Sequence, residues 1–384
     1  MIEIRDKRDC CGCNACVQKC PRQCIEQFED AEGFIYPRVD KARCIGCGLC
    51  EKVCPVIDQN PESKPLQVLA GWNGNEEIRM QSSSGGVFTL LAEQIIGRGG
   101  VVFGARFDEN WEVVHGYTES MDGLAAFRGS KYVQSRIGEA FRQAGAFLQQ
   151  GREVLFTGTP CQIAGLHRFL GKEYGNLFTM DIVCHGVPSP GVWKKYVERL
   201  VADLPPEGRL DGIYFRDKCT GWKEFSFSAH LSSPEKTALY TEKFYRNMYM
   251  RGFHANLYLR PSCYRCPSKS GKSGADITLA DFWGIERIMP RLDDDKGTGL
   301  VLVNTAKGKC LYDKLPIISQ EVKYEQALKG NHVIETSVPV PPQREIFFDS
   351  FGKEDFFRLT DRLTRVPLRT RLRRAAGRLI KLLR

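Results

Sequence analysis

Eight of the sixteen cysteines form two identical motifs near the N-terminus. The first motif runs Cys10, Cys13, Cys16, Cys20 and Pro21, and the second runs Cys44, Cys47, Cys50, Cys54 and Pro55. This spacing is typical of bacterial 4Fe-4S ligation, in which the fourth cysteine of one motif binds the cluster of the other. The sequence therefore predicts one cluster on Cys10, Cys13, Cys16 and Cys54, and a second on Cys44, Cys47, Cys50 and Cys20.

Zinc is the main alternative for these motifs, because cysteine pairs at two-residue gaps also bind it. A zinc site needs four ligands, however, rather than two interlocked sets of four that each end in proline. The 4Fe-4S interpretation is therefore favoured. Cys11 and Cys24 fall outside both sets and are interpreted as packed or spare thiols, and Cys219 and Cys310 as structural. We expect the fourth cysteine of each motif to begin a helix that leads away from the cluster.

Four more cysteines lie at turns in the later part of the chain. Cys161 follows a Thr-Gly-Thr-Pro turn, and Cys184 ends a predicted buried strand. Cys263 and Cys266 form a pair at a two-residue gap. Strand ends and turns are where α/β proteins place their sites, and four thiols are what one further cluster needs. The alternative is that these cysteines pack as small apolar side chains.

The elements that must position these residues alternate between strand and helix up to about residue 210. Predicted strands cover 68–72, 100–107, 112–117, 153–157 and 177–183, and predicted helices cover 86–96, 137–149, 161–170 and 192–203. This alternation predicts an α/β region with a parallel or mixed sheet. Later strands are predicted at 212–215, 224–231, 276–280 and 300–304. This second half has α+β character, and we expect it to pack on the first because no linker separates them.

Four parts are predicted along the chain. Residues 1–58 form an α+β ferredoxin-like module with two 4Fe-4S clusters, and residues 59–66 form a polar linker punctuated by proline. Residues 67–350 form a mixed α/β to α+β domain. Residues 351–384 form a basic C-terminal helix in which leucines and alanines recur at helical spacing among arginines. Such a helix fits an anionic membrane face, with docking to an acidic partner or packing on the body as alternatives.

The positive charge of the protein is concentrated at its C-terminal end. Nine of the 55 Lys and Arg residues lie in 362–384, which contains no acid, so the remaining basic residues balance the 46 Asp and Glu residues. The rest of the chain thus has no excess charge for a phosphate backbone, and a nucleic-acid-binding function is not expected. No signal peptide or transmembrane run is evident. We expect a cytoplasmic protein, with possible peripheral contact at the inner membrane face, and reduced cysteines suited to metal binding.

Seven short stretches, in one order, resemble a known family over most of residues 68–310. They are 82–88, 128–135, 158–166, 184–190, 215–218, 260–266 and 276–284. The chain resembles the beta subunits of hydrogenases and formate dehydrogenases that reduce the deazaflavin coenzyme F420, and the related 7-hydroxymethyl chlorophyll reductases. The ferredoxin-like module is fused here, whereas those subunits belong to larger complexes.

The resemblance implies an FAD beside a third 4Fe-4S cluster, with Cys161, Cys184, Cys263 and Cys266 as ligands. It also implies where the flavin lies. A serine-glycine run can present backbone N–H groups to a pyrophosphate, a later segment offers a charge and an aromatic ring, and a turn allows close backbone approach. The implied flavin-binding residues are Ser83, Ser84, Gly85, Gly86, Ser130, Lys131, Tyr132, Thr157, Gly158 and Thr159. From the residues alone, the serine-glycine run is more often a plain cap or turn.

These features predict an iron–sulfur flavoprotein oxidoreductase that passes electrons between ferredoxin-type clusters and a flavin acting on a small molecule. The alternative is a non-catalytic electron-transfer subunit that serves a partner enzyme. The expected partner is a one-electron carrier such as a ferredoxin or a dehydrogenase subunit. No catalytic acid or base is identified, and His185 is a candidate proton donor for which a structural role is favoured. Fused homologues suggest, by analogy only, a role in polysaccharide biosynthesis.

Overall fold

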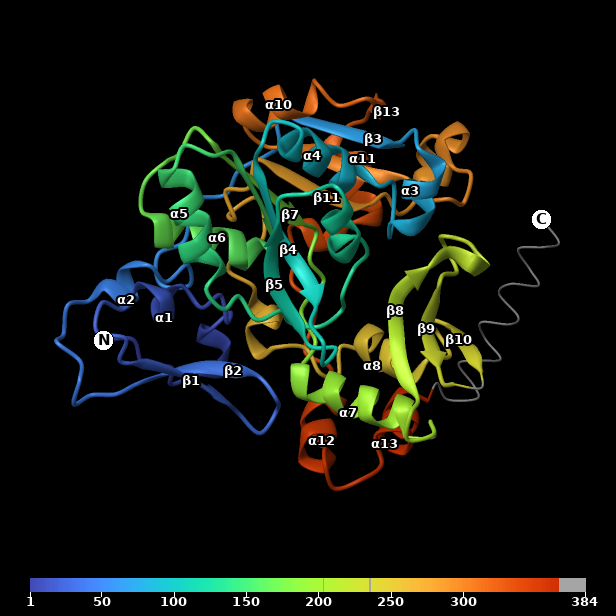
Figure 1. Cartoon of the computed structure of the whole chain (residues 1–384), viewed down its shortest axis with the longest axis horizontal. Coiled ribbons are helices and arrows are strands. Elements are labelled where there is room, and N and C mark those ends of the chain that lie inside the picture. Colours follow the sequence, from blue (N-terminus) through green and yellow to red (C-terminus); the bar gives the residue numbers. More distant parts are fainter. Residues whose placement is uncertain (203, 235, 366–384) are drawn as a thin grey trace.

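An eight-stranded mixed sheet lies at the centre of the computed structural model, which describes residues 1–202, 204–234 and 236–365 (Figure 1). Its spatial order is β13-β3-β12-β11-β7-β6-β4-β5. The strands are β3 (Gln67–Asn73), β4 (Val101–Phe107), β5 (Val113–Thr118), β6 (Val154–Gly158), β7 (Leu177–Ile182), β11 (Ile277–Asp281), β12 (Gly299–Val303) and β13 (Ile317–Glu321). Strands β4, β6, β7 and β11 run parallel, and antiparallel strands extend the sheet on both sides.

Helices cover both faces of this sheet. Phe103 and Phe156 pack with α5 (Ala140–Gln149) and α6 (Pro160–Leu170), whereas Val102 and Leu155 pack with α4 (Val87–Ile96) and α10 (Ala306–Tyr312). Successive side chains of a strand point to opposite faces, so a sheet covered twice needs apolar residues at every position. This explains the continuous apolar runs of β4 and β6. Three shorter helices follow strands of this sheet: α3 (Glu76–Gln81) follows β3, α9 (Ile285–Ile288) follows β11, and α11 (Tyr324–Gly330) follows β13.

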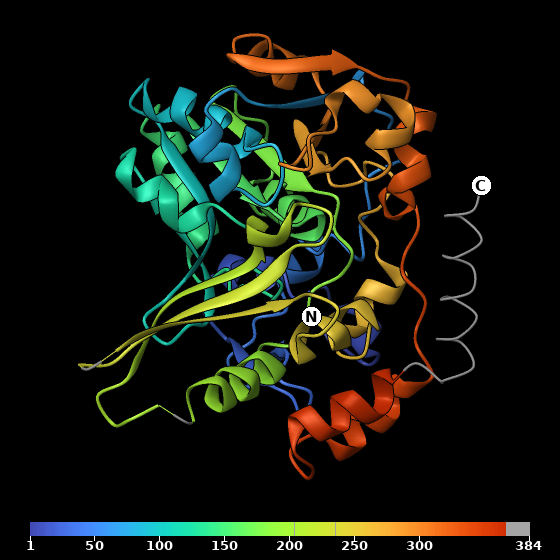
Figure 2. The same cartoon turned by 90° about the vertical axis from the view of Figure 1, so that its right-hand side faces the viewer.

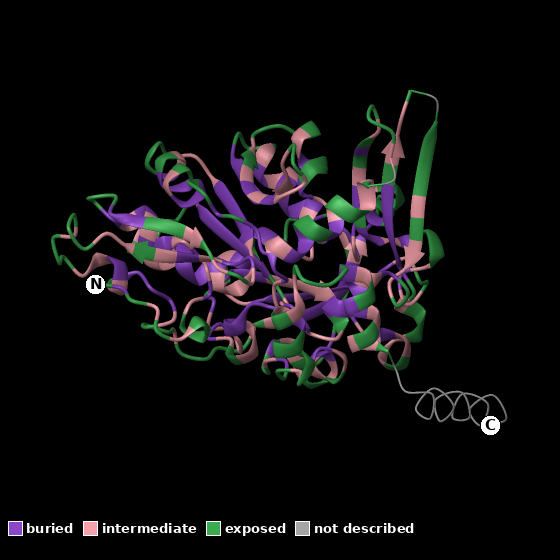
Figure 3. Cartoon of the chain, turned by 90° about the horizontal axis from the view of Figure 1, so that it is seen from below, coloured by how far each residue is buried: buried purple, intermediate pink, exposed green. Residues whose placement is uncertain are grey.

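A second sheet of three antiparallel strands reaches away from the first (Figure 2). It consists of β8 (Arg209–Asp217), β9 (Ser226–Ser232) and β10 (Thr237–Lys243). Its inner strands pack on α7 (Pro190–Val201), α8 (Met248–His254), α12 (Gln343–Ser350) and α13 (Phe356–Thr364) through an aromatic core. The outer strand β10 is mostly exposed, while the large sheet is mostly buried (Figure 3).

The N-terminal module contains the hairpin β1 (Ile25–Glu29) and β2 (Ile35–Val39) and two short helices, α1 (Ala15–Lys19) and α2 (Leu49–Lys52). The prediction that the fourth cysteine begins a helix is wrong. Cys20 caps the C-terminal end of α1, and Cys54 follows α2. Asn14 before α1 and Gly48 before α2 have positive φ and turn the chain into these helices. The third cysteine of each motif, Cys16 or Cys50, therefore already lies within a helix.

The module docks on α5 and α7 through close backbone and side-chain contacts. Arg142 on α5 donates from Nε and Nη2 to the Gln18 carbonyl, at 2.9 and 2.6 Å. The Gly33 and Gly191 backbones touch so closely that a Cβ on Gly33 would lie 2.5 Å from the Gly191 Cα. The segment 59–66 is also bound to the body, since the Ser63 N–H donates to the Ser270 carbonyl at 3.0 Å. Module and body therefore share one continuous core.

The predicted alternation of strands and helices up to residue 210 is found, and the sheet is mixed as expected. The two halves do more than pack together, because β11 pairs directly with β7 and joins the same sheet. The predicted C-terminal helix begins with α13, and residues 366–384 of that prediction lie outside the described residues. Within the described ranges, no helix is long and apolar enough to cross a membrane.

Candidate redox site

The motif cysteines gather in two sets, and the fourth cysteine of each motif lies with the first three cysteines of the other motif. Burial, followed by the charges of Cys10 and Cys54, raises the pKa of Cys16, so the last cysteine of the second motif lies beside the first motif. Conversely, Cys20 lines one small cavity together with Cys24, Cys44, Cys47 and Cys50, and its Sγ lies 3.4 Å from Cys24 Sγ. The structure thus brings the members of each predicted set near one another, with Cys24 beside the second set, and the assignment of the ligands stays a prediction.

Backbone N–H groups point at several of these sulfurs. The Ile2 N–H donates to Cys50 Sγ at 3.3 Å. The backbone N–H groups of Ile57 and Val56 act to lower the pKa of Cys54, although burial, the largest influence, raises it overall. Such N–H donors stabilise thiolates and tune the potential of an iron–sulfur cluster. These N–H donors act against burial, which raises the pKa of Cys16 and Cys54, and they would favour the thiolate form once a cluster binds.

The four later cysteines, although up to 105 positions apart, also converge. Cys161 lies in the first turn of α6, Cys184 follows β7, and Cys263 and Cys266 lie in and just after the turn η4 (Pro261–Arg265). Burial raises the pKa of Cys263 well above its usual value, and the charges of the other three cysteines raise it further. The Val187 N–H donates to Cys263 Sγ at 3.4 Å. These contacts fit a third set of cluster ligands.

None of the sets resembles the shell of a single ion. Among the described residues, no three His, Cys, Asp or Glu side chains are placed to hold one metal ion together. In a 4Fe-4S cluster each thiolate binds a different iron, which sets the four sulfurs wider apart than around one ion.

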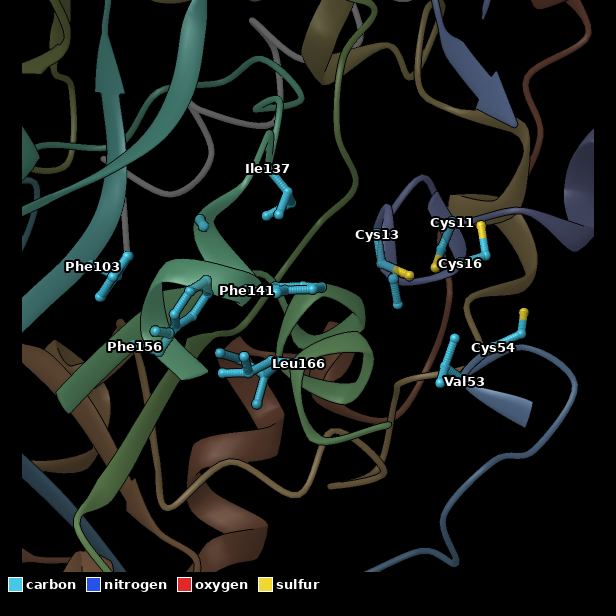
Figure 4. Close-up of a cluster of buried hydrophobic side chains, with 14 of the residues drawn as sticks. Cys11, Cys13, Cys16, Val53, Cys54, Phe103, Ile137, Phe141, Phe156 and Leu166 are labelled. Atoms are coloured by element: carbon cyan, nitrogen blue, oxygen red, sulfur yellow. The ribbon is translucent and has the colours of Figure 1, made fainter. Parts of the chain in front are cut away.

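Cys11, which sequence reasoning set aside, lies between the N-terminal module and the later cysteines. It is 5% exposed, and contact with the Cys13 thiol raises its pKa, while the Cys161 thiol acts in the opposite direction. Figure 4 shows Cys11, Cys13 and Cys16 grouped together, with Cys13 on the side of Phe141 and Leu166, and all of them belong to one buried cluster. Two of the three cysteine sets therefore come close to each other through Cys11. Only the fold could reveal this, since Cys161 is 150 positions away.

Gly165 allows this approach. It lies one helical turn after Cys161 on α6, so the two residues share one face of the helix. A Cβ at Gly165 would lie 2.8 Å from the Cβ and 2.9 Å from the Sγ of Cys13. Helix α6 therefore carries Cys161, and one turn later the missing side chain of Gly165 leaves room for Cys13 to pack against the same face.

A cavity of about 520 Å³ opens beside the later cysteines. Its wall includes Cys184, and it lies between the large sheet and the β8–β10 region. All ten residues that the resemblance implied for a flavin line this cavity: Ser83, Ser84, Gly85, Gly86, Ser130, Lys131, Tyr132, Thr157, Gly158 and Thr159. Residues from three separate segments thus meet at one concave site, which is the usual setting for a cofactor.

Helix α4 directs an uncapped N-terminus into the cavity wall. Gly86 is its N-cap at φ 75°, with no side chain capping the first turn. Uncapped N–H groups at a helix start favour anions such as a pyrophosphate. The Ser130 N–H donates to Ser83 Oγ at 2.8 Å, which joins two of the segments. Burial lowers the pKa of Lys131 to about 7, and its Nζ donates to the Ala126 and Arg128 carbonyls at 2.8 and 2.9 Å.

A buried hydrogen-bond network holds the 157–159 turn. His115 on β5 contacts the Thr157 carbonyl through Nε2 at 3.0 Å and Ser135 Oγ through Nδ1 at 2.9 Å. Gln162 donates to Ser135 Oγ at 2.9 Å and accepts from the Thr159 N–H at 2.9 Å. Burial lowers the pKa of His115 to about 4, so the ring stays neutral. Sequence reasoning missed this network because its members are far apart along the chain.

Arg216 and Asp281 form a buried ion pair in the opposite wall. The guanidinium donates to both carboxylate oxygens, at 2.7 and 3.1 Å, and stacks over Phe225 with 4.0 Å from Cζ to the ring centre. Arg216 Nη1 also reaches the Tyr132 hydroxyl at 3.3 Å. This pair was not singled out from sequence, although both residues lie in stretches that carried the resemblance. The ion pair holds the Arg216 guanidinium in contact with the Tyr132 hydroxyl at this wall of the cavity.

His185 lies in the cavity wall next to Cys184. Its Nε2 contacts Asn256 Oδ1 at 2.6 Å, and its ring meets Phe253 edge-on with 5.3 Å between centres. Burial lowers its pKa. These contacts account for its position without assigning it a proton-transfer role.

Comparison with family models identifies the class of protein to which these cysteines and this cavity belong, an iron–sulfur protein of the oxidoreductase, electron-transfer type. Residues 151–327 match the family model for the C terminus of the coenzyme F420 hydrogenase/dehydrogenase beta subunit, and residues 9–57 match a 4Fe-4S dicluster domain. The chain is thus an iron–sulfur protein related to the coenzyme F420 hydrogenase/dehydrogenase beta subunits, which confirms the resemblance recognised from its sequence stretches.

A solved structure is also similar. It comes from the F420-reducing NiFe hydrogenase complex of Methanosarcina barkeri and is 18% identical, with a TM-score of 0.45, over 72% of this chain and 91% of that one. No curated protein sequence matches the chain significantly.

Proposed function

We propose that this protein is an iron–sulfur flavoprotein oxidoreductase. Electrons would enter or leave through the two clusters of the N-terminal module and pass by a third cluster, on Cys161, Cys184, Cys263 and Cys266, to a flavin in the cavity. A bound flavin would exchange two electrons with a small molecule, whereas the clusters carry one electron each. The direction of flow is left open, and so is the substrate.

The observation that carries this proposal is the shared wall between cysteines and cavity. Cys184 lines the cavity itself, and Thr159, also in its wall, contacts Cys161 Sγ through Oγ1 at 3.3 Å. A redox centre on these cysteines would therefore lie directly beside anything bound in the cavity. A protein that only stores iron would not need its cysteines next to a cavity of cofactor size.

The residues of the cavity fit FAD in charge as well as in position. The α4 N-terminus, Lys131 and Arg128 offer positive groups for a pyrophosphate. Tyr132, which stacks on Phe253 with 4.6 Å between ring centres, offers an aromatic surface at the cavity wall for a ring system. These residues bind and orient the cofactor, and the cavity opens toward solvent to admit a substrate.

The second candidate is an electron-transfer subunit without its own substrate. It is favoured by the exposed position of Cys47 on the module, where a protein partner could approach. The expected partner in either case is a one-electron carrier. The two candidates differ in whether the cavity must hold a flavin that reacts with a free small molecule.

Iron, sulfide and flavin contents of anaerobically purified full-length protein test the proposal. About twelve irons and one flavin per chain support it, whereas about eight irons would leave only the module clusters. Clusters without flavin would contradict the oxidoreductase and leave the electron-transfer subunit. Reduction or oxidation of the bound flavin by a free small molecule would then exclude the second candidate.

A further inference from the structure

Arg260 is a fully buried cation without an acidic partner. Its side chain is 0% exposed, and within the described residues it forms no ion pair with Asp or Glu. The other two buried arginines differ in this respect, since Arg79 pairs with Asp294 and Arg216 with Asp281. A buried charge without a counter-charge is strongly unfavourable. Arg260 therefore needs an anion from another source.

The groups around Arg260 show where that anion would be. Its Nε donates to the Cys10 carbonyl at 2.7 Å, and its Nη2 lies 3.4 Å from Cys10 Sγ. The guanidinium also stacks over Tyr36 with 4.2 Å from Cζ to the ring centre. The nearest group that can carry a negative charge is thus a thiol of the first cysteine set. A cluster held by four thiolates is anionic and becomes more so when it takes up an electron.

Arg260 also joins three parts of the site. It lies three residues before Cys263, and it contacts Cys10 and the Ile35 carbonyl of the module, the latter at 3.1 Å. Its Nη1 donates to Gln134 Oε1 at 2.9 Å, directly before Ser135 of the cavity network. The bare Gly12 leaves room for these contacts, because a Cβ there would lie 2.5 Å from Gln134 Nε2 and 2.9 Å from Arg260 Cζ.

We propose that Arg260 is the counter-charge of the module cluster nearest the later cysteines, the one on Cys10, Cys13, Cys16 and Cys54, and that it raises the reduction potential of that cluster. This inference rests on the clusters of the proposed function. A fixed positive charge and an N–H donor at a ligand sulfur stabilise the reduced, more negative state over the oxidised one. One electron enters the cluster, and the guanidinium keeps its proton throughout. Arg260 is accordingly a positioning and tuning residue rather than a catalytic one.

The consequence concerns the order of potentials. The second module cluster, on Cys20, Cys44, Cys47 and Cys50, has backbone N–H donors at Cys50 and Cys20 but no buried arginine among its contacts in the described residues. The inner cluster should therefore be the easier of the two to reduce. Electrons that enter at the exposed module surface are then drawn inward, toward the cavity.

Variants of Arg260 test this directly by redox titration of anaerobic full-length protein, followed by electron paramagnetic resonance. Arg260→Met removes the charge, and we expect one cluster to become at least tenfold harder to reduce, a fall of about 59 mV in a one-electron potential. The other cluster potentials should stay in place. Arg260→Lys keeps the charge and should restore most of the wild-type potential.

Arg344 provides a matched control. It is another largely buried arginine between module and body. It is paired with Glu32 through Nη1 and Nη2 and donates to the Leu259 carbonyl at 3.1 Å, but it contacts no sulfur in the described part of the chain. Arg344→Met should reduce the thermal stability of the protein and leave every cluster potential unchanged. A shift of the same size in Arg344→Met would contradict a specific role for Arg260.

Two further outcomes decide the matter. An iron-loaded Arg260→Met protein that titrates like the wild type would overturn the proposal. If Arg260→Met does not retain iron, Arg260→Lys decides: retained iron with near-wild-type potentials supports the charge role, and loss of iron as in Arg260→Met contradicts it. Wild-type protein that binds no clusters would instead refute the proposed function, so the two failures are distinguishable.

Discussion

The N-terminal and the later cysteines are brought together in different ways. The eight motif cysteines lie within residues 10–54 and are held by two short helices and the turns before them. The four later cysteines span residues 161–266 and meet only because a helix start, a strand end and a turn converge beside the large sheet. A local motif can be read directly from its spacing, whereas a dispersed set depends on the whole fold.

The two regions should therefore respond differently to change. Damage to the large sheet or its turns should remove the later set and spare the motifs, whose ligands come from a short stretch of chain. Damage at the contact surface between them should affect the inner module cluster first, because Cys13 lies against α6.

Removal of a later cysteine should have the largest effect. We expect Cys184→Ser to lose about four of about twelve irons per chain, since one missing thiolate opens the third cluster while the module keeps its two. Iron and sulfide analysis of anaerobic protein measures this. Cys310→Ser, at an exposed thiol on α10, is the control and should keep all iron. Full iron content in Cys184→Ser would show that the later cysteines hold no cluster.

A side chain at Gly165 should separate the two regions. Gly165→Val places a branched side chain where a single Cβ already comes within 2.9 Å of Cys13 Sγ, so we expect a loss of about 1–3 kcal/mol in stability and weaker retention of the inner module cluster. Thermal unfolding and iron content measure the two effects.

Gly145→Ala on the neighbouring helix α5 is the matched control for that change. Among the described residues, its Cβ would come within 4 Å of Leu170 Cδ2 alone, at an ordinary 3.5 Å. Alanine is favoured over glycine in a helix by roughly 0.5–1 kcal/mol, so this variant should be neutral or slightly stabilised. Equal behaviour of the two variants would argue against close docking of Cys13 on α6.

Flavin affinity should depend moderately on pH through Lys131. Burial lowers the pKa of Lys131 to about 7, so the side chain is largely neutral above pH 8 in the flavin-free cavity. An anionic pyrophosphate beside it favours the ammonium form, and the affinity should fall several-fold between pH 7 and 9. Titration of flavin-depleted protein with FAD measures this.

Substitution of Lys131 separates charge from other causes of such a pH dependence. Lys131→Arg stays charged and should bind FAD with little pH dependence over the same range. Lys131→Met should bind more weakly and also without the pH dependence. A flat wild-type profile would place the pyrophosphate away from Lys131.

The smallest effect is expected at Cys11. Although Cys11 lies between Cys13 and Cys161, it is not part of any predicted ligand set. Cys11→Ser should keep all iron and change the cluster potentials only slightly, as judged by iron analysis and redox titration. Loss of four irons in this variant would mean that Cys11, rather than a predicted ligand, binds a cluster.

Much of this architecture was predictable, for identifiable physical reasons. The two cysteine motifs carry their own geometry, and the apolar runs of β4, β6 and β7 reveal a sheet that is covered on both faces. The segments around Ser83, Lys131 and Thr157 were recognised only through the resemblance, and the structure places all of them at one cavity.

Other features could not have been obtained from the sequence alone. The strands β10 and β13 are largely exposed, so they lack the apolar runs that mark buried strands. The pairs formed by His115 with Thr157, and by Arg216 with Asp281, join residues 42 and 65 positions apart. The position of Arg260 against Cys10 depends on docking across 250 positions, and no local pattern encodes that distance.

Reduction of the flavin through the third cluster is the most direct test of a single electron route. Full-length wild-type and Cys184→Ser proteins, each with FAD bound, are mixed anaerobically with a one-electron donor, and the flavin and cluster absorbances are followed in a stopped-flow instrument. The proposed route requires rapid loss of flavin absorbance in the wild type, and reduced module clusters with a flavin that stays oxidised in Cys184→Ser. Equally fast flavin reduction in both proteins would contradict it.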